Sequence, residues 1–558
     1  MADDVNALAQ EYFDYLLTAW PSWGHIMGNY ENAALFDDAS RAGEDEEIRV
    51  RRAFADRAEA IPADGLSAQD RITREMIVFD GRRNADILDA RLAEFGVDPI
   101  FGQQAGLPVR YPKFPIPDAT VADAMIDKTR GVAKNFRDMS DRLLEGVARE
   151  RTPAAFACDD TVTQIDAWLA KPLDDDPLLA TAEPTGVADR DAWRARLRDV
   201  IEHDVRPAMA HYRDTIRDRV RPHARDDEHV GLTWLADGDD AYSRMIRYHT
   251  TLEKDAREIH EIGLQQIEKL AGEYRELGAE VLGTSDVPEI FRRLRDDPAL
   301  HHTNGADIVA ASKRALAKAT AATGDWFGIL PKASCDVEEV QSGAIAFYFP
   351  PAKDGSRSGV FFMNTSDPEG WGRYQIEATS YHEGVPGHHL QLAISTELTS
   401  IPEFRKRAFI AAYGEGWGLY SERLADEMGL YSTPLDRMGM LEADSMRACR
   451  LVVDTGMHAL GWSRQKAIDY MVANSPMAVG HVTAEIDRYA VTPGQALAYM
   501  IGRLEIQRIR REAEEALGDR FAIKGFHDTV LGSGLMPLPV LNRVVRDWVD
   551  GQRAKTPA

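Results

Sequence analysis

Cysteine is scarce in this chain of 558 residues. Cys158, Cys335 and Cys449 lie far apart, and the sequence contains no Cys-x-x-Cys pair. A disulfide framework needs paired cysteines, and a thiolate metal site needs clustered ones. The sequence therefore predicts neither of these features, and a reducing compartment is the expected surrounding.

Long apolar runs and excess positive charge are also absent. The chain begins MADDVNALAQEYFDYLL, which is acidic and has no apolar core of the secretory type, and no run reaches membrane-spanning length. Its 66 Lys and Arg residues against 91 Asp and Glu give a net charge of −25. Such a surface repels phosphate backbones and anionic lipids. We expect a cytoplasmic protein without a nucleic-acid or membrane partner.

Helical periodicity, in contrast, fills most of the chain, and no internal repeat or low-complexity linker interrupts it. Thr250 with Glu253 predicts a capping-box start, and Thr433 before Pro434 predicts another helix start. The helices are expected at residues 4–20, 68–93, 120–149, 191–219, 250–278, 307–323, 403–428 and 433–460.

Strand patterns are few. Residues 344–350 (AIAFYFP) and 359–366 (GVFFMNTS) are apolar and β-prone, and a turn-rich link separates them. They predict a hairpin or two strands of a small sheet. The fold class expected is mainly α, and proline-rich residues 108–117 and 172–184 are interpreted as loops. We expect one large helical domain over 1–558, with halves of about 1–330 and 331–558.

The most informative stretch is RYQIEATSYHEGVPGHHLQ, residues 373–391. A His-Glu pair followed by another His one turn later is typical of a catalytic zinc helix. Here His388 is six positions after His382, a rotation of about 600° that puts the two side chains on different faces of a straight helix. Pro386 interrupts the backbone hydrogen bonding of the helix, and Gly387 permits unusual backbone angles. A bulge at these residues therefore brings His388 back to the face that carries His382. His389 is the rival ligand, but it lies two turns away.

A third metal ligand must come from elsewhere in the chain. Glu415 stands between two glycines in AAYGEGWGLYSERLADEMGLY, residues 411–431, and Glu422 shares its helical face. The glycines indicate close backbone approach. Glu415 is the predicted third ligand, and Glu422 is a second candidate or a group that orients a ligand. An ordinary solvated glutamate is the alternative.

These segments together resemble a known family. The strings EATSYHEGVPGHHLQ, YGEGWGLYSERL, RACRLVVDTGMHALGWS, EIDRYAVTPGQALAYMIGRLEI and FHDTVLGSGLMPLPVL look like the bacterial domain-of-unknown-function family 885. The match covers about the last 220 residues. That family is similar in fold to the thermostable carboxypeptidases, which are helical zincins with a deep cleft.

The resemblance implies a role for each residue of the motif. His382, His388 and Glu415 would hold one Zn²⁺, and Glu383 would be the general base that takes a proton from water and returns it to the leaving amine. The chain departs from the zincin pattern by a two-residue insertion in the His-Glu helix.

Further candidates surround this motif. Arg450, Asp454 and His458 recur every four residues on one helical face, as either an exposed ion-pair ladder or a polar stripe facing a cleft. His458 or Tyr489 is predicted to stabilise an oxyanion, and Asp454 to support a ligand. For Tyr489, core packing is the alternative.

Substrate contacts are expected on two other elements. Arg450, with Arg447 and Arg488 as alternatives, is a candidate for holding a substrate carboxylate. The segment with Ala346 and Phe347 is a candidate edge strand for pairing with an extended peptide, or else a plain core strand.

Three functions fit these patterns. The first is a zinc metallopeptidase that cleaves short peptides, of carboxypeptidase or oligopeptidase type, acting as a monomer or homodimer. The second is a zinc hydrolase of another amide or ester. The third is a helical binding protein with a degenerate metal site, which the retained Glu383 disfavours.

Overall fold

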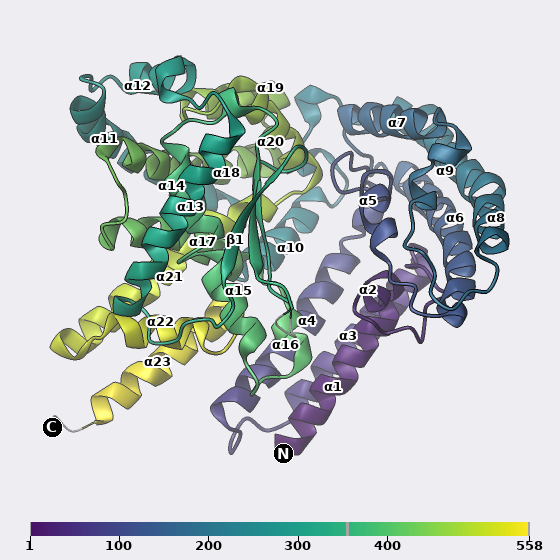
Figure 1. Ribbon diagram of the computed structural model, residues 1–558, viewed down its shortest axis with the longest axis horizontal. Coiled ribbons are helices and arrows are strands. Elements are labelled where there is room, and N and C mark those ends of the chain that lie inside the picture. The colour runs from purple at the N-terminus through teal and green to yellow at the C-terminus, as the bar shows by residue number, and fades with distance from the viewer. Residues whose placement is uncertain (1, 353–355, 556–558) are drawn as a thin grey trace.

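The computed structural model describes residues 2–352 and 356–555, and the chain is mainly helical, as predicted (Figure 1). The predicted helices near residues 4–20, 68–93, 120–149, 307–323 and 433–460 are all present. The helices are α1 (Ala2–Ala19), α2 (Pro21–Ile26), α3 (Arg41–Ala60), α4 (Ala68–Asp89), α5 (Gln103–Arg110), α6 (Ala119–Ala148), α7 (Ala155–Leu169), α8 (Arg190–Val200), α9 (Arg206–Asp214), α10 (Gly238–Thr250), α11 (Ala256–Val281), α12 (Val287–Asp296), α13 (Gly305–Ala322), α14 (Gln375–Glu383), α15 (His388–Glu397), α16 (Glu403–Arg407), α17 (Ala411–Glu427), α18 (Pro434–Leu460), α19 (Arg464–Ala473), α20 (Val479–Val491), α21 (Ala498–Leu517), α22 (Ile523–Leu531) and α23 (Leu538–Ala554).

Helix starts follow capping chemistry, although one predicted start is wrong. Thr433 caps α18 as expected, because its side chain accepts from the amide of Asp436. Thr250 instead ends α10, since Thr251 has a left-handed φ of 62° that terminates the helix. The next helix, α11, begins six residues later, where the side chain of Asp255 accepts from the amide of Glu258.

Two long predicted helices are divided. The segment predicted at 191–219 consists of α8 and α9 with π-helical turns after each. The segment predicted at 403–428 is two helices, α16 and α17, because the chain is extended at Ala408 and Ile410. The break lets α17 begin in a new direction, and α17 carries the predicted ligand Glu415.

The described residues contain a three-stranded sheet with the order β1-β3-β2. Strand β2 (Ala346–Phe349) is antiparallel to β3 (Gly359–Asn364), which confirms the predicted pairing; residues 353–355 of the link between them lie outside the described residues. Strand β1 (Cys335–Val340) pairs in parallel with β3 and was not predicted. Its sequence CDVEEV is too polar to give an apolar strand pattern.

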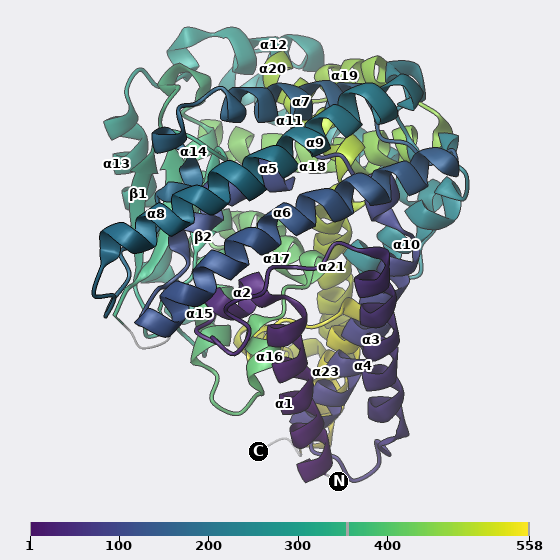
Figure 2. The same cartoon turned by 90° about the vertical axis from the view of Figure 1, so that its right-hand side faces the viewer.

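The hydrophobic core joins segments that are distant in sequence. One cluster combines Leu8 and Ile77 with Phe526 and Leu541, so the first helices pack against the last ones. Figure 2 shows α1, α3 and α4 standing beside α21 and α23. A second cluster joins the helices of residues 119–220 to α18 and α20. The two predicted halves therefore share cores, and the single domain over 1–558 stays a prediction. Among the described helices, none has the length and apolarity needed to cross a bilayer.

Candidate metal centre

The His-rich stretch folds as two short helices with a sharp link. Helix α14 ends at Glu383 and α15 begins at His388, so the backbone changes direction at Gly384–Gly387. The Val385–Pro386 peptide bond is cis. Gly387 lies so close to the previous turn that an added Cβ would stand 1.9 Å from the carbonyl oxygen of His382. Only glycine fits this close approach.

The turn brings three predicted ligands together. His382, His388 and Glu415 each offer one ligand atom, and these atoms all lie within 4.8 Å of one another. Oε2 of Glu415 is 3.7 Å from Nε2 of His382 and 3.4 Å from Nε2 of His388. Tetrahedral zinc with bonds of about 2.0–2.1 Å requires ligand atoms about 3.3–3.4 Å apart. The two carboxylate–imidazole separations are close to this value, and a donor set of two imidazoles and one carboxylate suits zinc.

A second carboxylate orients one of the imidazoles. Nδ1 of His382 is 2.7 Å from Oε1 of Glu422, so the ring presents Nε2 to Glu415 and His388. Gly418, one turn before Glu422, lies flat against this ring: an added Cβ would be 2.7 Å from its Cε1 and Nε2. Glu422 therefore contacts the His382 ring in the way expected of a group that orients a metal ligand.

Protein atoms alone leave this cluster unsatisfied. Nδ1 of His388 and Oε2 of Glu422 are buried and have no hydrogen-bond partner among the described residues. Burial by itself lowers the pKa of His382, but Glu415 and Glu422 outweigh it and raise that pKa to about 9. Burial opposes the charge of Glu415, yet the two imidazoles hold its pKa well below the usual range. A cation bound here would release a proton from His382.

Glu383 is positioned differently from the other carboxylates. It follows His382 directly, is partly exposed, and has no hydrogen bond or ion pair among the described residues. Burial raises the pKa of the Cys335 thiol, and the charge of Glu383 adds to this, which places the carboxylate near β1. A carboxylate without a structural partner beside the cluster can exchange protons with a bound molecule.

The structure separates His388 from its rival His389. The His389 ring is held by the Tyr348 hydroxyl, 2.9 Å from Nδ1, and by the Ala333 carbonyl, 3.1 Å from Nε2. Both nitrogens of His389 are therefore used by β2 and by the segment before β1. His388 is the histidine that joins the cluster.

The predicted oxyanion donors need correction. His458 is fully buried, with Nδ1 accepting from the amide of Leu232 at 3.2 Å and Nε2 3.0 Å from the carbonyl of Tyr489. Burial lowers the pKa of His458 to about 3. The fully buried Tyr489 hydroxyl donates to Glu485 and accepts from Arg450. Neither group has a free donor for a substrate.

Of the other predictions on α18, one is corrected and one stays open. Arg450 is 4% exposed and donates to Glu485 at 2.8 Å, but its Nη1 is buried without a partner among the described residues, so its role as a substrate anchor stays a prediction. Asp454 accepts hydrogen bonds from the Tyr242 hydroxyl and from the amide of Gly494, and it contacts none of the predicted metal-ligand side chains among the described residues. The polar face of α18 is a buried structural network, and neither the exposed ladder nor the cleft stripe describes it.

Strand β2 lies at an edge of the sheet, as the sequence predicted. Strand β2 pairs only with β3, so one of its backbone edges is unpaired within the sheet. Ala346 is partly buried and Phe347 is 36% exposed, with its ring stacked on Phe362. The plain core strand is therefore excluded.

Sequence reasoning missed Tyr499, which lies beside the cluster. Helices α17 and α21 cross where an added Cβ at Gly416 would stand 2.6 Å from Cα of Gly502, so their backbones touch next to Glu415. Burial raises the pKa of Tyr499, and the charge of Glu415 raises it further. No hydrogen bond of the Tyr499 hydroxyl is found in the described part of the chain. Tyr499 lies ten residues after Tyr489 in the same segment, and no local pattern distinguishes the two.

The fold and the cluster define a mainly helical protein with two imidazoles and a carboxylate converging in its interior. The chain belongs to the family described as bacterial protein of unknown function (DUF885), whose model matches residues 21–545. This confirms the family resemblance.

Two solved structures share the fold. One is "the putative lipoprotein from Colwellia psychrerythraea", 24% identical with a TM-score of 0.87, covering 98% of this chain and 99% of that chain. The other is "a putative lipoprotein of unknown function from Shewanella oneidensis", 16% identical with a TM-score of 0.79, covering 97% and 99%. No protein in the curated set matches the chain.

These comparisons contradict one expectation. The sequence predicted a cytoplasmic protein, but both solved structures are described as putative lipoproteins, a description that places those two proteins at a membrane or outside the cytoplasm. The cytoplasmic prediction is therefore wrong by this comparison. It rested on cysteine content, on an acidic N-terminal segment without an apolar core and on the lack of long apolar runs.

Proposed function

We propose that this protein is a zinc-dependent hydrolase that cleaves short peptides. The observation that carries the proposal is the convergence of His382, His388 and Glu415 within 4.8 Å, with Glu422 fixing the His382 ring. The family resemblance to helical zincins of the thermostable carboxypeptidase type supports the same chemistry.

Each residue of the site has a distinct task in this proposal. His382, His388 and Glu415 would hold the ion, which would polarise a scissile carbonyl and activate water at neutral pH. Glu383 accepts the proton of the attacking water and delivers it to the leaving amine. The unpartnered Tyr499 hydroxyl takes the place of Tyr489 as donor to the developing oxyanion.

The edge strand favours a peptide over another amide or ester. An extended peptide can add to the unpaired edge of β2, so that its backbone is aligned without selection of its side chains. Residues 346 and 347 lie on this strand. A hydrolase of another amide or ester would use the same metal residues but would have no use for this edge.

Metal analysis and turnover together test the proposal. Full-length protein purified without chelator should carry one zinc ion per chain and should cleave members of a peptide library, read by mass spectrometry. Glu383→Gln should keep the zinc and lose about 10²–10⁴-fold in rate. Unchanged turnover in this variant would remove Glu383 from the mechanism, and zinc-free protein with no uptake of added zinc would leave only a helical binding protein.

A further inference from the structure

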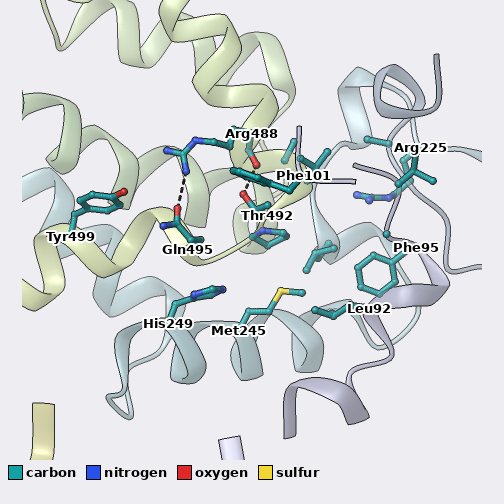
Figure 3. A pocket seen from close by; sticks show the side chains of 17 residues that line it. Leu92, Phe95, Phe101, Arg225, Met245, His249, Arg488, Thr492, Gln495 and Tyr499 are labelled. Carbon is teal, nitrogen blue, oxygen red and sulfur yellow. Dashed lines mark hydrogen bonds between the residues drawn. The ribbon is translucent and has the colours of Figure 1, made fainter. Parts of the chain in front are cut away.

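A cavity of about 490 Å³ lies beside Tyr499 (Figure 3). Its walls come from residues 92–101, from α10 and from residues 488–499, so segments of both predicted halves enclose it. Leu92, Phe95, Phe101 and Met245 give it apolar sides. This volume is in the range of sites for small ligands.

The lining of the cavity contains no carboxylate. It includes Arg225 and Arg488 but no aspartate or glutamate, and burial lowers the pKa of His249 to about 4, which keeps that ring neutral. The chain as a whole has a net charge of −25. A pocket without a carboxylate in so acidic a protein selects for an anionic or neutral ligand.

Arg225 is the buried cation of this pocket. It is only 9% exposed and has no carboxylate within 4.0 Å among the described residues. Nε donates to the Thr152 carbonyl at 2.9 Å, and Nη1 donates to the carbonyls of Val230 and Gly231. Nη2 of Arg225 has no acceptor in the part of the chain that the structure describes. Burial lowers the pKa of Arg225 to about 10, because no carboxylate compensates its charge.

Arg405 is an instructive counterpart. It is fully buried, also lacks a carboxylate partner, and also donates to backbone carbonyls, those of Gln69 and Ser533. It does not line the cavity. Nε of Arg405 is also buried without a partner among the described residues, so the difference at Arg225 is its place on the wall of an open volume.

Tyr499 lies at the end of the cavity opposite Arg225 (Figure 3). Arg488 is already engaged, since Nη1 donates to Oε1 of Gln495 at 2.8 Å and Nη2 to Glu485 at 2.8 Å. Tyr499 stands one helical turn before Gly502, whose backbone lies against Gly416, so this end of the cavity is on the side of the helix that carries Glu415.

We propose that this cavity binds an apolar group that carries a carboxylate, with Nη2 of Arg225 as the donor to the carboxylate. This inference rests on the proposed hydrolase function in one respect: the carboxylate is assigned to the C-terminal end of the substrate peptide. The protein then acts on the ends of short peptides and has weak activity on chains whose C-terminus is blocked.

Binding of a simple probe tests the site directly. N-acetylphenylalanine and its amide have the same shape and differ in charge, and each is titrated into the full-length protein by calorimetry. The acid should bind about 10–100-fold more tightly than the amide, the ratio that a hydrogen bond to a charged group gives. Equal binding of the two probes, or no binding of either, would overturn the proposal.

Variants locate the effect at Arg225. Arg225→Gln should remove the preference for the acid, whereas the matched control Arg405→Gln should keep it. Because Arg225 also holds three carbonyls, Phe101→Ala provides a second variant at a residue that is 63% exposed. Phe101→Ala should weaken both probes equally; unaltered binding of both would contradict the cavity as their site.

The source of the carboxylate is tested by turnover. Peptides with a free C-terminus should be cleaved faster than their amidated forms, and N-acetylphenylalanine should compete with them. Equal cleavage, with tight binding of the acid, would assign the site to a separate carboxylic acid. Probe binding is also measured in His388→Ala, where it should persist without metal, so failure of the zinc proposal and failure of the carboxylate site are distinguishable.

Discussion

Two buried groups of polar side chains in this protein differ in how their atoms are satisfied. In the imidazole–carboxylate cluster (His382, His388, Glu415), the carboxylate–imidazole separations of 3.4 and 3.7 Å are longer than ordinary hydrogen bonds, and Nδ1 of His388 has no partner among the described residues.

The α18 polar row (Arg450, Asp454, His458) is paired instead, except at Nη1 of Arg450, which has no partner among the described residues. Glu485, Tyr242 and backbone groups engage its members. Buried polar groups are nearly always satisfied, so a buried convergence that the protein does not satisfy points to a ligand. A paired row points to structure.

Loss of a ligand histidine should have the largest effect. His388→Ala should abolish zinc binding and turnover, because two side chains rarely hold zinc firmly. Zinc content by mass spectrometry and peptide cleavage are the measurements. His389→Ala is the matched control, since its ring contacts only protein groups, and it should retain the metal. Retention of zinc in His388→Ala would place the ion elsewhere.

Glu422→Gln should weaken the cluster without destroying it. The amide no longer accepts strongly from Nδ1 of His382, so zinc affinity should fall about 10–100-fold, as for other carboxylates that orient ligand histidines. Competition with a zinc chelator measures this change. Glu442→Gln changes a buried glutamate whose carboxylate is bonded by Gln375, and it should leave zinc affinity unchanged. Equal losses in both variants would indicate general destabilisation.

His458→Ala should separate the two groups most sharply. It leaves the amide of Leu232 and the carbonyl of Tyr489 unpaired in the interior, which costs about 1–3 kcal/mol of unfolding free energy for each unpaired group. Denaturant titration measures the loss. Zinc content per folded molecule should stay unchanged; loss of zinc with intact stability would return His458 to the site.

The smallest expected effect is a pH dependence of stability that comes from Asp454. Burial raises its pKa from 3.8 to about 7, so the folded state binds a proton that the unfolded chain has lost between these values. Stability due to this group therefore falls as pH rises, by at most about 1.4 kcal/mol per pH unit.

Asp454→Asn tests this contribution, because the amide mimics the protonated acid. Urea unfolding at pH 5 and pH 8 should give a smaller decrease for the variant than for the wild type. An identical decrease in both proteins would assign the pH dependence to other groups, such as Glu442, whose burial raises its pKa to about 7.

The sequence predicted the elements and the cluster better than the residues around them. Thr433 and Pro434 define the start of α18 by local chemistry, and Pro386 with Gly387 permits the turn that brings His388 to His382. These are properties of neighbouring residues. The wrong start at Thr250 had the right residue types, but tertiary packing placed Thr251 in a left-handed conformation.

Residues whose role depends on distant partners were beyond sequence reasoning. Tyr489 and Tyr499 lie ten residues apart in one segment, and only packing shows that the first bonds Glu485 while the second lies beside Glu415. Arg225 gives no local pattern at all. Its proposed role in binding a carboxylate comes from the lack of a carboxylate partner among the described residues, which only the three-dimensional arrangement reveals.

The packing of the first helices against the last has a consequence for biosynthesis. The apolar faces of α1, α3 and α4 have partners such as Phe526, Leu541 and Val545, which leave the ribosome near the end of translation. The nascent chain therefore carries exposed hydrophobic helices for most of its synthesis, a state that invites aggregation and chaperone binding.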